Sequence, residues 1–131
     1  MTASASATKA FAQIELVIAD YLDGIHFGDL AKLRRAMHPD CRMIALSGDE
    51  YAITGMEEYF TAVANRKSPA EIGEPRMDSV EAIDVSRAPV AVVTLRCLVL
   101  GKACADTLTL IEHDSEWKII SKVFSYELVA G

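Results

Sequence analysis

The chain has 131 residues, of which 51% are hydrophobic, and its 13 basic and 19 acidic residues give a formal net charge of −6. This length and composition predict one globular domain with its own core and exclude a disordered chain. An acidic surface repels phosphate backbones and anionic lipids, and no apolar run approaches the ~20 residues of a membrane span. Neither nucleic acid nor a membrane is therefore an expected partner.

The first eight residues are rich in Ala and Ser and lack the basic start and apolar run of a signal peptide, so residues 1–8 are predicted to be a flexible tail. The odd number of cysteines indicates reduced core residues rather than a disulfide framework, and hence a cytoplasmic protein. The three cysteines are Cys41, Cys97 and Cys104. Cys41 has no base beside it, so a nucleophilic role is not expected.

Two helices are predicted next. Apolar residues recur at spacings of three and four, the pattern of an amphipathic helix, at Phe11, Ile14, Ile18, Tyr21 and Ile25. Asp29 is the expected N-cap of a short second helix carrying Leu30, Leu33 and Met37. Pro39 disfavours the helical conformation of His38, so this helix should end there.

The rest of the chain predicts mainly strands. A hairpin of residues 41–46 and 51–54 precedes a third helix, which Thr54 and Glu57 should begin as a capping box. A polar loop, residues 65–75, leads to four strands near residues 77–85, 90–100, 103–112 and 117–127. This order indicates a single-domain α+β fold, over residues 1–131, with a mainly antiparallel sheet.

The predicted hairpin of residues 90–100 and 103–112 determines the orientation of Asp106. If Gly101 and Lys102 form a two-residue turn, Cys97 pairs with Asp106. Side chains alternate along strands, so Asp106 then shares the apolar face that packs under the helices. A bulge in the turn would instead move Asp106 to the outer face.

These residues resemble the NTF2-like (SnoaL-like) superfamily and, within it, small bacterial proteins labelled putative lumazine-binding. The resemblance extends from about Phe11 to Tyr126 and rests on four segments: Tyr21 seven residues before Gly28-Asp29, His38-Pro39-Asp40, Asp106-Thr-Leu-Thr-Leu, and Trp117-Lys-Ile-Ile with Lys122-Val-Phe124. It implies a cone of three N-terminal helices on a strongly curved sheet, a blind pocket, and a homodimer packed through the outer sheet face.

Ketosteroid isomerases are members of this superfamily that allow a residue-by-residue comparison. Their hydrogen-bonding Tyr matches Tyr21, and their second acid falls in the region of Asp106 to Thr109. Their general-base Asp falls at Ala45, which cannot move a proton. The resemblance therefore implies a retained cavity without that mechanism.

The expected pocket residues are Tyr21, His38, Met43, Phe60 and Asp106. Tyr21 is either a core aromatic or a phenol that donates to a ligand, and Asp106 is either a structural carboxylate or an acid/base. His38 is either a helix-end residue or part of the pocket rim. If Met43 and Phe60 fill the interior, no pocket remains.

Three functions follow from these residues. The first is a homodimer with an apolar pocket for a small, ring-containing organic ligand. The second is an isomerase, dehydratase or cyclase in which Asp106 moves a proton and Tyr21 stabilises the oxyanion. The third is a structural or interaction module without a cavity. No metal-ligand spacing or phosphate-binding loop is present, so neither a metal nor a cofactor is expected.

Overall fold

The computed structural model describes residues 2–129, which form three helices and six strands. Two helices and a hairpin come first: α1 (Thr2–Phe27), α2 (Leu30–Ala36), β1 (Met37–Ser47) and β2 (Glu50–Gly55). The remaining elements are α3 (Met56–Ala64), β3 (Asp78–Arg87), β4 (Val90–Val99), β5 (Lys102–His113) and β6 (Glu116–Leu128). The α+β class agrees with the sequence prediction. Helix α3 follows the first hairpin, as the order of the predicted elements indicated, so the description as three N-terminal helices fits only roughly.

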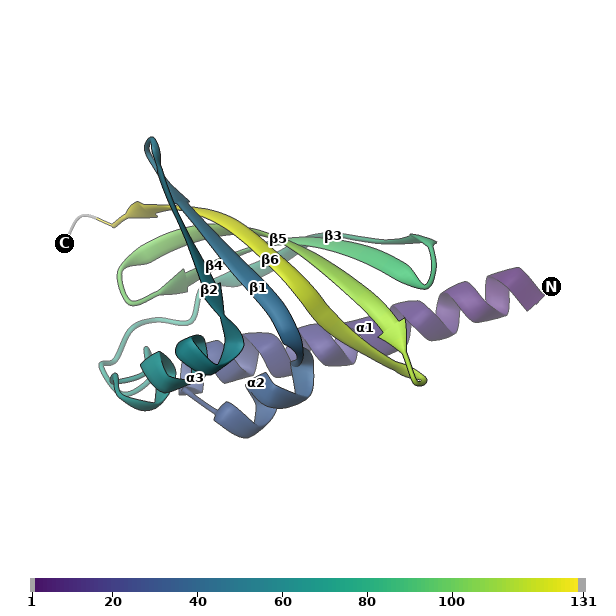
Figure 1. Cartoon of the computed structure of the whole chain (residues 1–131), viewed down its shortest axis with the longest axis horizontal. Helices are drawn as coiled ribbons and strands as arrows, with labels where there is room; N and C mark the ends of the chain where they lie inside the picture. Colours follow the sequence, from purple (N-terminus) through teal and green to yellow (C-terminus); the bar gives the residue numbers. More distant parts are fainter. Residues whose placement is uncertain (1, 130–131) are drawn as a thin grey trace.

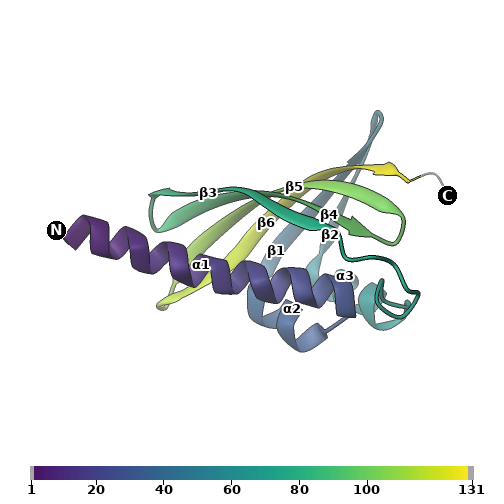
Figure 2. The ribbon, with the colours of Figure 1, turned by 180° about the vertical axis from the view of Figure 1, so that it is seen from behind.

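All six strands form one sheet in the order β2-β1-β6-β5-β4-β3. Strands β1 and β6 are parallel, and every other neighbouring pair is antiparallel. The sheet twists and curves, and all three helices lie on the same side of it, with α1 running along its length (Figures 1 and 2). This side is the inner face, and the opposite side is the outer face.

Helix α1 is longer than its apolar pattern predicts. Residues 2–8, where the sequence predicts a flexible tail, are helical, and Met1 of that segment lies outside the described residues. The inner side of α1 contributes Ile14, Ile18 and Tyr21 to the core. No helix in the described part of the chain is both long and apolar enough to cross a bilayer.

The break between α1 and α2 forms as its residues predict. Gly28 has a φ of +66°, a left-handed conformation that glycine adopts without steric cost. Asp29 then caps α2, because its side chain accepts a hydrogen bond of 3.1 Å from the Lys32 amide.

Helices α1 and α2 cross at Gly24, a position of α1 without a side chain. A Cβ on Gly24 would lie 2.6 Å from Leu33 Cγ, and Leu33 is fully buried. Glycine at this position therefore allows α2 to fold back tightly against α1.

The register of β4 against β5 differs from the prediction by two residues. Leu100 and Gly101 occupy the turn with φ values of 52° and 78°, as in a type I′ hairpin, and Val99 pairs with Lys102. Cys97 consequently pairs with Cys104, and Asp106 with Leu95. The predicted turn and register are wrong. The predicted faces are unaffected, because a shift of two positions preserves the alternation of side chains.

The capping box at α3 does not form. The N-cap is Gly55, without a side-chain cap, and Thr54 instead lies in β2 as the partner of Met43. Glu57 and Glu58 occupy the first turn, where acidic side chains interact favourably with the helix dipole.

Candidate functional site

Three polar side chains lie inside the apolar core, between α1 and the inner face of the sheet. The Tyr21 hydroxyl donates a hydrogen bond of 2.6 Å to Asp106 Oδ2, and Lys122 Nζ lies 3.9 Å from the same oxygen. Tyr21 is fully buried, while Asp106 and Lys122 are 2% and 6% exposed. We call Tyr21, Asp106 and Lys122 the buried polar cluster. Its opposite charges offset each other, which reduces the cost of placing them in the core.

A bulge in β6 places Lys122 on the inner face. Leu110 pairs with Ile119 and Thr109 with Ser121, so Ile120 is an extra residue on β6. A regular alternation from the buried Trp117 and Ile119 would have pointed Lys122 outward. The bulge shifts this alternation by one residue.

Sequence analysis did not identify Lys122 as a member of the site. A signal is present in the sequence: the inward positions Trp117 and Ile119 are odd-numbered, whereas the next inward aromatic residues, Phe124 and Tyr126, are even-numbered. Such a change of phase within one strand is typical of a bulge.

The surroundings of the cluster keep both Tyr21 and Lys122 protonated. Burial raises the pKa of Tyr21 well above its ordinary value, and the neighbouring Asp106 charge raises it further. Burial alone would lower the pKa of Lys122, but the Asp106 charge opposes this, and the pKa of Lys122 lies above its ordinary value. Tyr21 therefore remains a neutral donor and Lys122 a charged ammonium.

A recess of about 80 Å³ opens beside the cluster. Its lining combines apolar and cationic side chains from α1, α3, the segment after α3 and four strands, chiefly Met43, Tyr59, Arg66, Lys102, Lys122 and Phe124. Lys122 belongs both to this lining and to the buried polar cluster. The recess is well below the ~300–1,000 Å³ of pockets for drug-sized ligands, so it has room for a single ring or a small head group.

The expected pocket residues do not all meet at this recess. Met43 lines it. Tyr21 and Asp106 lie outside its lining, and Asp106 faces Lys122, which does line it. Phe60 is buried beneath the Arg34 guanidinium, which lies 4.4 Å from its ring centre. His38 also lies outside the lining, and its Nδ1 accepts a hydrogen bond of 3.0 Å from the Asp40 amide.

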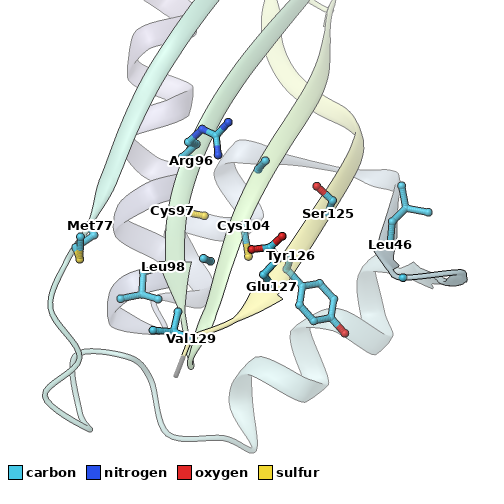
Figure 3. A pocket seen from close by; sticks show the side chains of 13 residues that line it. Leu46, Met77, Arg96, Cys97, Leu98, Cys104, Ser125, Tyr126, Glu127 and Val129 are labelled. Carbon is cyan, nitrogen blue, oxygen red and sulfur yellow. The ribbon is translucent and has the colours of Figure 1, made fainter. Parts of the chain in front are cut away.

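A larger hollow of about 610 Å³ lies along the ends of β4, β5 and β6, with side chains from Leu46 at one side to Met77 at the other (Figure 3). Several of its lining residues, including Arg96, Leu98, Ala103 and Ser125, alternate with the buried residues of their strands and so belong to the outer face. Its lining also includes the inner-face residues Cys97 and Cys104, and Cys104 lines the recess as well, so the hollow and the recess adjoin.

The three cysteines are free and buried. Burial raises the pKa of the Cys41 thiol to about 11, which makes it a poor nucleophile. The ligand atoms of Cys97, Cys104 and Asp106 lie within 4.8 Å of one another, a spacing that could hold a metal ion. The Lys122 ammonium beside Asp106 would repel a cation there.

Solved structures show which fold this is. The chain is similar to an NTF2-like protein of unknown function from Silicibacter pomeroyi DSS-3, with 18% identity and a TM-score of 0.80 over 92% of this chain and 98% of that one. An NTF2-like protein of unknown function from Shewanella baltica OS155 gives 17% identity and a TM-score of 0.78 over 92% and 95%. A ketosteroid isomerase-like protein from Erwinia carotovora atroseptica SCRI1043 gives 15% and 0.63 over 88% and 94%. The fold is NTF2-like.

The sequence itself matches a family model. Residues 9–125 match the family described as "Putative lumazine-binding". The chain therefore belongs to this family, within the NTF2-like superfamily that the sequence resemblance had indicated. A search of curated proteins finds no match.

Proposed function

We propose that this protein binds a compact organic ligand in the recess and does not act on it chemically. The observation that carries the proposal is the recess itself, where a cationic side chain, Lys122, lies among the aromatic and aliphatic walls of Tyr59, Phe124 and Met43. Apolar walls with a few placed polar groups are typical of small-molecule sites. The family description, which refers to lumazine binding, supports a ring-containing ligand.

The arrangement of Tyr21 favours binding over acid/base catalysis. An oxyanion donor must direct its proton to the substrate, but the Tyr21 hydroxyl donates to Asp106 Oδ2 at 2.6 Å. The position of the isomerase general base holds Ala45, which is half-buried on β1. The buried polar cluster thus supports a static role, in which Tyr21 and Asp106 hold Lys122 at the recess.

Binding can be tested with two single-ring probes of matched shape, benzamide and benzoate. We expect at least one of them to shift the Met43 methyl NMR signal saturably, because Met43 lines the recess. Val99 also lines the recess, so Val99→Phe should fill it and abolish the shift. Val92→Phe is the matched control, since Val92 lies on the outer face and is 38% exposed. If neither probe moves the Met43 signal, the proposed function is wrong.

We also propose that the protein is a homodimer that packs through its outer sheet face. A row of mainly apolar residues crosses this face in register: Ile53 pairs with Ile44, Ile44 with Val123, and Val123 with Thr107. Ile53 and Val123 are 61% and 36% exposed. Contiguous apolar residues on an outer face are typical of protein–protein interfaces.

Light scattering coupled to size exclusion tests this assembly. Native protein should elute as a dimer, and Val123→Glu should weaken the dimer by about a hundredfold or more, because it buries like charges across a symmetric interface. Leu16→Glu is the control, since Leu16 is 71% exposed on α1, away from the outer face. A native protein that remains monomeric at high concentration contradicts the proposal.

A further inference from the structure

The recess concentrates positive charge in a protein with a net charge of −6. Arg66, Lys102 and Lys122 all line it, and its lining contains no carboxylate. Within the side chains that the structure describes, Arg66 and Lys102 form no ion pair, and Lys122 faces only Asp106. Three cations against two nearby carboxylates, Asp106 beside Lys122 and Glu74 at the β4–β5 turn, leave a local net charge of +1.

Lys122 also has hydrogen-bonding capacity that the described residues do not use. Its ammonium carries three N–H donors, and the Asp106 oxygen at 3.9 Å is too distant for a hydrogen bond. Its Nζ lies 4.5 Å from the centre of the Phe124 ring and 5.1 Å from that of Tyr21. The aromatic rings and Asp106 stabilise its charge, but its donors remain available at the recess.

The β4–β5 turn, which carries Lys102 at the recess, is held by Glu74. The Glu74 carboxylate accepts hydrogen bonds from the Leu100 and Gly101 amides, at 2.6 and 2.8 Å. Leu100 and Lys102 both line the recess, on either side of Gly101 in the β4–β5 turn. The Glu74 carboxylate is thus bound to the turn amides and does not line the recess. A preorganised rim reduces the entropy that a ligand loses on binding.

We propose that the recess recognises the anionic head group of its ligand, a carboxylate or a group of similar size and charge. Lys122 binds the anion at the floor, while Lys102 and Arg66 attract it at the rim. The small volume of the recess admits the head group, and the rest of the ligand extends out of the recess. This proposal rests on the proposed binding function and specifies the chemistry of its ligand.

The same two probes test the proposal, because benzoate and benzamide differ in charge and hardly in shape. From Met43 methyl titrations at low salt we expect benzoate to bind at least about tenfold more tightly than benzamide. Lys122→Met and Lys102→Met should each remove most of this preference. Lys102→Met keeps the test valid even if the buried substitution prevents folding. Lys67→Met is the control, because Lys67 is exposed and lies outside the recess lining.

The outcomes separate the two proposals. Equal binding of benzamide and benzoate, or lysine variants that bind benzoate as tightly as the native protein, overturns the anionic head group and leaves the binding function standing. Binding of neither probe overturns both. A benzoate preference that falls with added salt and with each lysine substitution supports both.

Discussion

Replacing Asp106 by Asn should lower the free energy of unfolding by about 3–5 kcal/mol, the range for removing one partner of a buried ion pair. The substitution keeps the size of the side chain and leaves Tyr21 an acceptor, but it removes the charge that faces Lys122 at 3.9 Å. The Lys122 ammonium is then buried without compensation. Urea unfolding, followed by Trp117 fluorescence, measures the change.

A double-mutant cycle distinguishes the ion pair from a general loss of packing. Lys122→Met should also be destabilising, since it leaves the Asp106 carboxylate buried, whereas Asp106→Asn with Lys122→Met should cost less than the sum of the two. Tyr21→Phe removes one hydrogen bond to a charged group and should cost about 1.5–3 kcal/mol. Strict additivity of the two charge substitutions would falsify the proposed coupling.

Leu33→Ala should lower the free energy of unfolding by about 2–5 kcal/mol, the range for a fully buried leucine whose surroundings cannot collapse. Leu33 is fully buried against Gly24, at the crossing of α1 and α2. Because Gly24 has no side chain, α1 offers no atoms at this position to fill the space. The same urea unfolding experiment measures the loss.

Gly24→Ala supplies the matched comparison at this crossing. Alone, it should destabilise the protein by about 1–3 kcal/mol, because its Cβ would lie 2.6 Å from Leu33 Cγ in a packed core. Combined with Leu33→Ala it should be much less costly, since the added methyl group then occupies vacated space. A Gly24→Ala variant as stable as the native protein would show that the two helices can separate freely.

Local signals in the sequence were sufficient for most elements of the fold. The apolar stripe of α1 and the Asp29 cap of α2 depend on neighbouring residues, so they could be predicted. The N-cap of α3 could not, because β1 holds Thr54 in the sheet as the partner of Met43 and leaves Gly55 to begin the helix. Pairing with a distant strand here overrides a local motif.

The candidate site was predictable only in part, for a similar reason. The inward orientation of Asp106 followed from alternation, which tolerates the error of two positions at the β4–β5 turn. The inward orientation of Lys122 depends on one extra residue at Ile120, which reverses the alternation for the rest of β6. The recess volume depends on how side chains from separate elements pack, and no sequence pattern measures that.

The position of β6 in the sheet has a consequence for the order of folding. Although β6 is the last strand in the chain, it lies between β1 and β5 and pairs with both. Until β6 has left the ribosome, β1 and β5 each have an unpaired edge, and Asp106 has no ammonium partner. The paired residues of β1 and β6, such as Met43 and Lys122, are about 80 positions apart in the chain, and non-local pairing of this kind slows folding. The pairing of β6 therefore both completes the sheet and brings the Lys122 ammonium to Asp106.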